Sequence, residues 1–515
     1  MIIRLGLVLL PVILFAQEVA PVVPVALTPE AQGSISTEPV IAPALKHELT
    51  QYGITWRFSE PTLCGRFITG DWWVQGPVTL QTITPAPIKG RHGSVINPDA
   101  GRKQGYDDRG LLGSNGWYDF SLVPQFPLVL EPGQSLVSTI SVEKEGQATK
   151  DTVKYQYCRG AIQTAAVLTC VRAAPPANAF RPGYAGVWKK IYTTDDLHLD
   201  RLPNLEPPAP IPSLALLERF LERPWIDHWM GWAGRHIHPL ENMPDYGREI
   251  THITSSAALV LITKDAPKKF TTLFYRYLQL GIDLYGTTKA NNNLWTADGG
   301  HCSGRKVPIV FAAVLFDDPE MMRVQAAFQE DQQTYYGAGY RGQKALWRIT
   351  DGDERKHEDL PPAEWAGSRF KGENNGWKSD GYRGLNGPTW VGQALAIQLM
   401  GAKSVWNHNA FFDYVDRWVT ESQSGMVDQK TLKPKGYEAF PHGVGKDMCG
   451  DFVEQMWTMY RPKTAEIAAK FQPGLEASLT KSKPVANPAS STSQGVPEET
   501  AVDKKDTAKP GNGER

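Results

Sequence analysis

Two glycine-rich segments of the chain carry side chains that can exchange protons or bind an anion. Residues 298–308 run into an apolar stretch that ends at Phe316, and residues 380–388 run into another that ends at Met400. Each segment ends at a proline, which fits the first turn of a helix because its missing N–H has no partner there. The sequence therefore predicts two polar loops that each open a buried helix, a favourable place for a binding or catalytic site. The titratable residues of the two loops include Asp298, His301, Arg305, Asp380, Tyr382 and Arg383.

A third polar stretch, residues 225–252, adds histidines and arginines to this set. Basic groups outnumber acidic ones across the three segments, although the chain of 515 residues has a net charge of −1. A locally basic surface on a nearly neutral protein favours an anionic ligand. We expect the three segments to converge on one concave surface. The candidate catalytic residues are His301, His252, Tyr246, Tyr382, Arg305, Arg248, Asn293, Asp298 and Asp380. The candidate substrate-binding residues are Arg235, His236, His238, Trp232, Trp295, Trp377, Lys378 and Arg383.

The tryptophans near these groups have two interpretations. The flat indole faces of Trp232, Trp295 and Trp377 offer surfaces on which sugar rings can stack. Trp225, Trp229 and Trp232 also lie at helical spacing, which is equally the pattern of a stripe packed in the core. The sequence leaves both interpretations open.

The elements that must position these residues change type along the chain. Residues 49–200 contain short runs of β-branched and aromatic residues separated by Gly, Pro and Asn, which predicts an antiparallel β-sandwich. A Pro-rich linker, residues 201–212, leads to residues 213–472, where apolar positions at helical spacing predict an (α/α) toroid of helical hairpins. The expected strands are 54–58, 71–74, 78–83, 136–142, 152–157 and 165–171, and the expected helices are 214–221, 253–262, 273–285, 307–316, 321–333, 390–400 and 411–419.

Both ends of the chain are predicted to lie outside the folded part. Residues 1–16, in which Arg4 precedes an apolar run, are expected to be a signal peptide, followed by a mobile leader at 17–48. Residues 473–515 are expected to be a disordered tail. We therefore expect a secreted or periplasmic protein with no membrane insertion after removal of the signal. Five cysteines suit an exported protein with few disulfides, and a Cys158–Cys170 bridge is predicted.

The predicted arrangement of β domain, helical hairpins, signal peptide and Trp-rich basic loops resembles a known architecture. The chain resembles the α/α-toroid polysaccharide lyases, in which a helical toroid is paired with an antiparallel β domain, and is also similar to the six-hairpin glycosidases. The resemblance covers roughly residues 50–470 and is architectural. Lyases of this kind often carry Asn-Asn-His with a downstream Arg and Tyr. In this chain the run Asn291-Asn-Asn293 is followed by His301 as the next histidine.

The resemblance implies cleavage of an acidic, uronic-acid-containing polysaccharide by β-elimination. A base removes the proton next to the sugar carboxylate, a neutralising group stabilises the resulting enediolate, and an acid protonates the leaving oxygen. The implied roles are base for His301 or His252, acid for Tyr246 or Tyr382, and neutralising group for Asn293, Arg248, Arg305 or Arg383.

Two other functions remain open from the same residues. A glycoside hydrolase would use Asp298 and Asp380, with carboxyl groups about 6.5–9.5 Å apart in an inverting enzyme and about 5–5.5 Å apart in a retaining one. A non-catalytic glycan-binding protein would need only the tryptophans and the basic rim. No metal or cofactor is expected, since His236 and His238 share a face only on an extended segment. The charge balance gives no indication of nucleic-acid binding.

Overall fold

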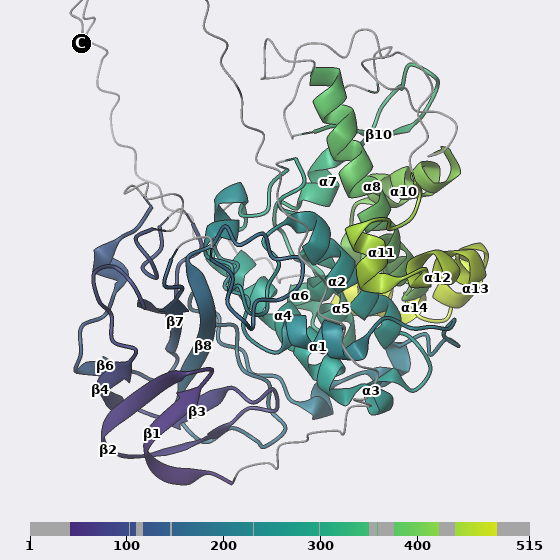
Figure 1. The fold of residues 1–515 in the computed structure, drawn as a ribbon. Coiled ribbons are helices and arrows are strands. Elements are labelled where there is room, and N and C mark those ends of the chain that lie inside the picture. Colours follow the sequence, from purple (N-terminus) through teal and green to yellow (C-terminus); the bar gives the residue numbers. More distant parts are fainter. Residues whose placement is uncertain are drawn as a thin grey trace, which may run out of the picture.

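The computed structural model describes residues 42–101, 103–109, 117–144, 147–229, 231–297, 299–349, 358, 375–421 and 438–481, and in residues 375–381 it describes the backbone alone. The protein is a mixed α/β structure in which a curled N-terminal β-sheet packs beside a C-terminal helical region (Figure 1). The predicted order of a β part followed by a helical part is confirmed.

The β part is one continuous, eight-stranded sheet with the order β5-β7-β8-β3-β2-β4-β6, and β1 pairs with β2. Its strands are β1 (Ala44–Gln51), β2 (Ile54–Arg66), β3 (Trp72–Gln75), β4 (Val78–Thr84), β5 (Ser94–Ile96), β6 (Leu128–Leu130), β7 (Ser135–Ser141) and β8 (Ile162–Val171). β3 and β8 pair in parallel, whereas the other pairs are antiparallel. The sheet is therefore mixed, which corrects the antiparallel prediction, and a sandwich of two sheets is not confirmed.

The two faces of the sheet pack against different partners because successive side chains of a strand point to opposite sides. On β8, Ala166 and Leu168 join a core made by the sheet alone, where Trp56 is also buried. Ala165 and Val167 lie on the other face, in a cluster that includes aromatic and aliphatic residues of the 226–237 segment. One face of the sheet thus supports the segment that carries several candidate site residues.

The helical region is built from α1 (Leu214–Leu221), α2 (Gly247–Leu261), α3 (Ala266–Lys269), α4 (Thr271–Ala290), α5 (Lys306–Leu315), α6 (Pro319–Met322), α7 (Gln329–Gln333), α8 (Asn375–Leu399), α9 (Lys403–Trp406), α10 (Asn409–Glu421), α11 (Val444–Cys449), α12 (Phe452–Tyr460), α13 (Thr464–Ala468) and α14 (Gln472–Lys481). A short hairpin of β9 (Thr334–Tyr336) and β10 (Ala345–Trp347) lies between α7 and α8. α2 packs on α8 and α4 packs on α5. A toroid of hairpins is not confirmed.

One predicted loop is in fact a helix. Pro308 lies in the first turn of α5, as predicted, but Pro388 lies inside α8, which already begins at Asn375. The glycines of residues 380–388 were interpreted as loop residues, yet those in the middle of α8 serve close packing. A Cβ on Gly387 would collide with the Trp418 ring of α10, and one on Gly392 would lie 2.8 Å from the Ser255 side chain of α2.

Several boundaries and one covalent link differ from the predictions. The expected helix at 321–333 is divided into α6 and α7, and residues 152–157 form no strand. The Pro-rich linker packs along the helices, where the Leu205 N–H donates to the Ile262 carbonyl at 3.0 Å. The expected mobile leader extends to residue 48, but β1 already begins at Ala44. At the other end, α14 occupies the start of the expected disordered tail, and its Leu475 is buried.

The predicted Cys158–Cys170 disulfide is wrong, because all five cysteines are free thiols. Cys170 lies within β8, and its thiol donates to the Leu130 carbonyl at 3.3 Å. Cys158 lies beyond the sheet in an irregular segment, with its thiol 3.7 Å from the Gln156 carbonyl. The two residues therefore do not share the strand pair on which the predicted bridge depended.

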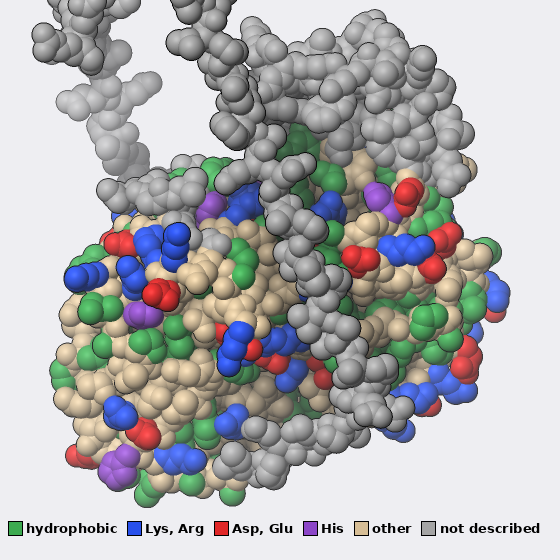
Figure 2. Space-filling model, in the orientation of Figure 1, with side chains coloured by type: hydrophobic (Ala, Val, Ile, Leu, Met, Phe, Trp, Pro, Cys, Tyr) green, Lys and Arg blue, Asp and Glu red, His purple; other side chains and the backbone are tan. Residues whose placement is uncertain are grey.

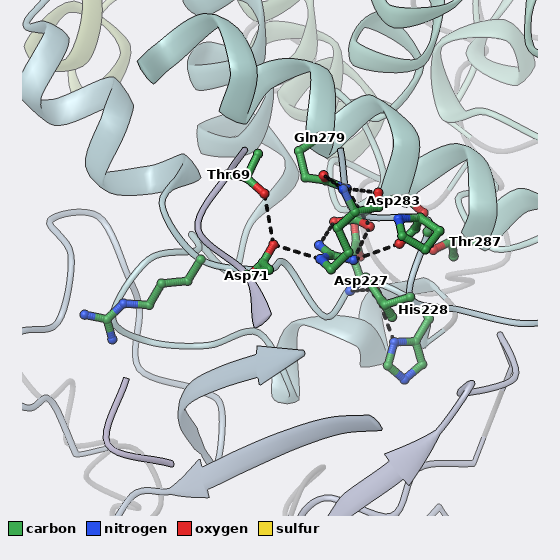
Figure 3. Close-up of polar contacts among 12 residues, drawn as sticks. Thr69, Asp71, Asp227, His228, Gln279, Asp283 and Thr287 are labelled. Atoms are coloured by element: carbon green, nitrogen blue, oxygen red, sulfur yellow. Dashed lines mark hydrogen bonds and ion pairs between the residues drawn. The ribbon is translucent and has the colours of Figure 1, made fainter. Parts of the chain in front are cut away.

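A buried ion cluster joins the sheet to the helices (Figure 3). The Arg181 guanidinium, with 1% of its surface exposed, donates to Asp71 beside β3 at 2.8 Å and to both carboxylate oxygens of Asp283 on α4 at 2.9 and 2.6 Å. Gln279 also accepts the Arg181 backbone N–H at 3.0 Å. Since a buried charge is tolerated only when it is paired, these contacts fix the position of α4 against the sheet.

We expect Arg181→Met to lower the free energy of unfolding by about 3–5 kcal/mol, because it leaves two buried carboxylates without their cation. Chemical denaturation followed by circular dichroism measures this. Arg57→Met is the matched control, since the Arg57–Glu48 pair has side chains 56% and 53% exposed. The control should lose at most about 1 kcal/mol. Equal losses in the two variants would contradict the proposed importance of the cluster.

Gly387→Ala should destabilise the protein, whereas Gly474→Ala should not. Both glycines are helical, and alanine normally favours a helix by up to about 1 kcal/mol. A Cβ on Gly474 of α14 would meet nothing within 4 Å, whereas one on Gly387 would overlap the Trp418 ring. Thermal unfolding should show Gly474→Ala unchanged or stabilised and Gly387→Ala destabilised by about 1–3 kcal/mol. If Gly387→Ala stabilised the protein, the contact between α8 and α10 would have room for the added methyl group.

Candidate functional site

The loop at residues 299–305 lies between the start of α2 and the middle of α8, and its glycines allow this close approach. Gly299 has a φ of +59°, and a Cβ there would lie 2.8 Å from the Tyr382 ring of α8. A Cβ on Gly300 would lie 2.8 Å from the hydroxyl of Tyr246, which immediately precedes α2. On the other side, a Cβ on Gly247 would collide with the Gly300 carbonyl. Side chains at these positions would push the two tyrosines away from the loop.

This packing brings together His301 of the loop, Tyr246 before α2 and Tyr382 of α8, three of the candidate catalytic residues. The rings of Tyr246 and His301 meet edge to face, with centroids 4.7 Å apart and planes at 78°. Tyr382 lies against the backbone just before His301 and interacts electrostatically with Tyr246. Three proton-carrying side chains therefore share one site.

Buried polar groups hold the loop from behind. The Arg305 guanidinium donates to the carbonyls of His301 at 3.0 Å and Ser303 at 2.9 Å, and it pairs with Asp227 at 2.7 Å. Burial alone would raise the pKa of Asp227, but Arg305 and His238 hold this pKa well below its usual range. With these contacts and 2% exposure, Arg305 supports the loop and does not face a ligand.

The loop is also held from α7 and α8. The Glu330 carboxylate accepts the Gly304 N–H at 2.7 Å and the Ser303 hydroxyl at 3.2 Å. The Asn386 amide donates to the Gly299 carbonyl at 2.8 Å. These bonds fix the backbone on both sides of His301, which leaves its ring as the part of the loop available for chemistry.

A basic and aromatic rim adjoins His301. Arg235, His236 and Trp232 come from the 3₁₀ turn Gly231–His236, and Arg235 lies over the Trp232 ring at 5.4 Å. Trp232 is 43% exposed, whereas Trp225 and Trp229 are buried in the core, so of these three tryptophans Trp232 alone presents an accessible face. Figure 2 shows Lys and Arg side chains on the face where the sheet adjoins the helices.

Two rim residues were missed by the sequence analysis. Arg159 and Tyr157 precede β8; the Arg159 guanidinium lies over the Tyr157 ring at 4.9 Å and pairs with Asp245 at 3.6 Å. Tyr157 is 44% exposed and accepts a hydrogen bond from Arg248 at 2.8 Å. Their segment was predicted to be a strand bearing a disulfide cysteine. Its cluster of aromatic and basic residues, Lys154, Tyr155, Tyr157 and Arg159, was the available signal.

The electrostatics of the site set the protonation of its central pair. Burial, followed by the positive charges of Arg235 and Arg159, lowers the pKa of His301 to about 3, so its ring is neutral at neutral pH. Burial raises the pKa of Tyr246 well above its usual value, so its hydroxyl keeps its proton. The site therefore contains a neutral imidazole able to accept a proton and a phenol able to donate one.

Other predicted residues lie away from this centre or are engaged elsewhere. His252 is buried on α2 against Gly445, and burial lowers its pKa to about 3. Arg383 pairs with buried Glu358 at 2.5 Å. Arg248 donates to Glu249 at 2.7 Å, but it stays beside the site, since its guanidinium lies 6.0 Å from the centre of the Tyr246 ring. Three further predicted residues, His238, Trp295 and Asn293, lie in separate places.

His238 is buried between Pro244 and Asp227, Trp295 is buried in a stack with Phe328, and Asn293 is exposed. Trp295 thus presents no face for a sugar. Asp298 lies outside the described residues, as do the side chains of Trp377, Lys378 and Asp380.

Comparison with known proteins gives no relative: no family model, curated protein or solved structure matches the chain. Within the described residues there is no group of three or more His, Cys, Asp or Glu side chains placed to hold a metal ion. Within the same part of the chain, no helix has the length and apolar character needed to span a bilayer.

The support of the site should make the fold acid-sensitive. The His228 ring lies between the hydroxyls of Tyr106 at 3.2 Å and Tyr184 at 3.3 Å, and burial lowers its pKa from 6.5 to about 4. Between these values the unfolded chain binds the extra proton, so stability falls as the pH decreases from about 6.5 towards 4, by up to about 1.4 kcal/mol per pH unit.

His228→Gln should therefore flatten the dependence of unfolding free energy on pH in that interval, even though it also lowers stability at neutral pH. Denaturation curves at several pH values give the two slopes. His47→Gln, at an exposed position of β1, is the control and should retain the wild-type slope. An unchanged slope in His228→Gln would mean that this ring does not contribute to acid sensitivity.

Proposed function

We propose that the protein is an exported polysaccharide lyase that cleaves an acidic, uronic-acid-containing polysaccharide by β-elimination. The observation that carries the proposal is the contact of neutral His301 with protonated Tyr246 beside the arginines of the rim. Base, acid and anion-binding groups are the three requirements of this reaction. The export part of the proposal rests on Arg4 and the apolar run that follows it.

In the proposed reaction, the base takes the proton from C5, next to the sugar carboxylate. The electrons of the C5–H bond form a C4=C5 double bond as the bond from C4 to the glycosidic oxygen breaks. The leaving oxygen then receives a proton, so no water is consumed. We assign the base to His301 and the proton donor to Tyr246, with Tyr382 beside them; positive charge from Arg235 stabilises the enediolate.

The low pKa of His301 becomes useful only when substrate is bound. In the free protein, burial and the neighbouring arginines make the imidazole a weak base. A bound carboxylate offsets the positive charges of Arg235 and Arg159 and thereby raises the pKa of His301 towards the working pH, where general-base catalysis is most efficient. The site would thus gain its base on binding an acidic sugar.

The rim supports a saccharide as the ligand. Trp232 and Tyr157 are large aromatic side chains with 43% and 44% of their surface exposed. Exposed aromatic faces beside arginines can pack on the apolar face of a sugar ring while the guanidinium groups bind its carboxylate. A glycoside hydrolase or a glycan-binding protein could use the same rim, so the assay must separate these functions.

We expect His301→Ala to lower the elimination rate by about 10²–10⁴-fold, since it removes the base. Tyr246→Phe should lower the rate similarly through loss of the acid, with glycan binding largely retained. The assay follows the ultraviolet absorbance of the conjugated double bond released from polyuronate substrates, together with new reducing ends. Tyr275→Phe, on a partly buried ring of α4 that packs on Phe180, is the control and should keep the wild-type rate.

Two results would redirect the proposal. Reducing ends without the absorbance would favour the hydrolase and direct attention to Asp298 and Asp380. Binding without any product, unchanged by His301→Ala, would favour a glycan-binding protein. Wild-type turnover of His301→Ala would exclude this residue as the base.

A further inference from the structure

Three buried nitrogen atoms at the rim have no hydrogen-bond partner among the described residues. They are Nδ1 of His301, Nε2 of His236 and Nη1 of Arg159, and both carboxylate oxygens of the neighbouring Asp245 are likewise buried without a hydrogen-bond partner. The nearest carboxylate to Arg159 is Asp245, at 3.6 Å, which is an ion pair too long for a hydrogen bond. Buried polar atoms without partners are rare in folded proteins, because the lost hydration is not replaced. Their occurrence together marks a place where a polar ligand would complete the hydrogen bonding.

The tautomer of His236 follows from its one contact. Its Nδ1 lies 3.1 Å from the Arg159 carbonyl oxygen, which can only accept a hydrogen bond, so Nδ1 carries the proton. Nε2 then holds a lone pair in the neutral ring. The residue is 3% exposed, so this lone pair is almost removed from solvent. The Nε2 atom gains a hydrogen-bond partner if a donor of the ligand reaches its lone pair, or if Nε2 is protonated and donates to an acceptor of the ligand.

The charged groups around the two imidazoles are mostly positive. The groups that act on them are Arg235, Arg159 and His238 for His236, and Arg235, Arg159, Arg305 and His236 for His301. Of the nearby acids, Asp227 is paired with Arg305 and His238, and buried Asp245 lies next to Arg159. Burial, assisted by the arginines, lowers the pKa of His236 to about 4 and keeps both rings neutral.

We propose that Arg159 and His236, beside His301, form a subsite for one sugar carboxylate, in which the ligand takes the place of Asp245 beside Arg159. The inference rests on the proposed function for the class of ligand, an acidic sugar, but it does not require cleavage. Arg159 donates to the ligand, and the added negative charge favours protonation of His236 at Nε2, which turns its lone pair into a donor, while His301 stays neutral as its role as base requires. Filling of the subsite is therefore accompanied by proton uptake.

The neighbouring aromatic ring selects a sugar over a simple anion. Trp232 stands edge to face with His236, with ring centroids 6.0 Å apart, and a large part of its surface is open to solvent. A pyranose ring stacked on this indole would carry its carboxylate towards Arg159 and His236. The contribution of Arg159, which precedes β8, means that the β part completes a site otherwise built from the helical region.

Calorimetric titration of the full chain with glucuronate tests the subsite, with glucose as the neutral control and inorganic sulfate as the simple anion. We expect glucuronate to bind, glucose to bind at least about 10-fold more weakly, and sulfate to bind more weakly than glucuronate. Titrations in two buffers of different protonation enthalpy should show proton uptake with glucuronate. Equal binding of glucose and glucuronate, or stronger binding of sulfate, would overturn the proposal.

Variants separate a specific site from a loss of folding. Arg159→Gln should weaken glucuronate binding by at least about 10-fold. Asp245→Asn should tighten it, because the competing carboxylate is gone, and an unfolded variant could not give this result. His236→Asn should reduce the number of protons taken up. Arg57→Gln, an exposed arginine of the sheet, is the control and should bind as wild type.

The outcomes also separate this inference from the lyase proposal. Glucuronate binding that depends on Arg159, without any elimination product, would support the subsite and contradict the lyase. Elimination with an unchanged KM in Arg159→Gln would contradict the subsite and leave the lyase in place.

Discussion

The pairing of Arg181 with Asp71 and Asp283 is the contact on which the arrangement of the two parts depends. A guanidinium that is 1% exposed must have its charge matched, and the carboxylates that match it come from the sheet and from α4. The polar path continues from α4 towards the site. The Tyr184 N–H donates to Asp283, and the Tyr184 hydroxyl accepts the Asp227 N–H at 3.0 Å. Asp227 in turn pairs with Arg305, which holds the His301 carbonyl. The position of the sheet and the position of His301 are thus parts of one buried network.

The candidate site lies where this network reaches the surface. Its parts come from the segment before β8, the turn before α2, the 299–305 loop and α8, and close backbone contacts at glycines allow them to meet. The burial that makes these contacts possible also removes water from the titratable groups. The same packing therefore positions His301 and Tyr246 and sets their pKa values in opposite directions, towards a neutral imidazole and a protonated phenol.

Glycine shows why a residue pattern can be interpreted correctly in one place and wrongly in another. In residues 298–308 the glycines do form a loop, with φ values of +59° at Gly299 and +92° at Gly304. In residues 380–388 a similar run is helical, and the missing Cβ of Gly387 makes room for the Trp418 ring. Local sequence cannot distinguish these cases, since the demand for a missing Cβ comes from a residue distant in the chain. The cysteine prediction was wrong for a related reason: spacing along the chain does not determine which thiols face each other.

The sequence by itself determined the order of β and helical parts and several element positions such as α1 and β4, because hydrophobic period is a local property. Residue chemistry placed His301, Tyr246 and Tyr382 among the candidates, whose roles stay predictions. Tertiary structure alone decided that β3 and β8 are parallel, that Arg305 and Arg383 are engaged in buried ion pairs, and that Arg159 joins the rim. Whether an arginine supports a fold or faces a ligand depends on which carboxylate lies next to it. That partner comes from a segment far away in the chain, so only the packed structure can identify it.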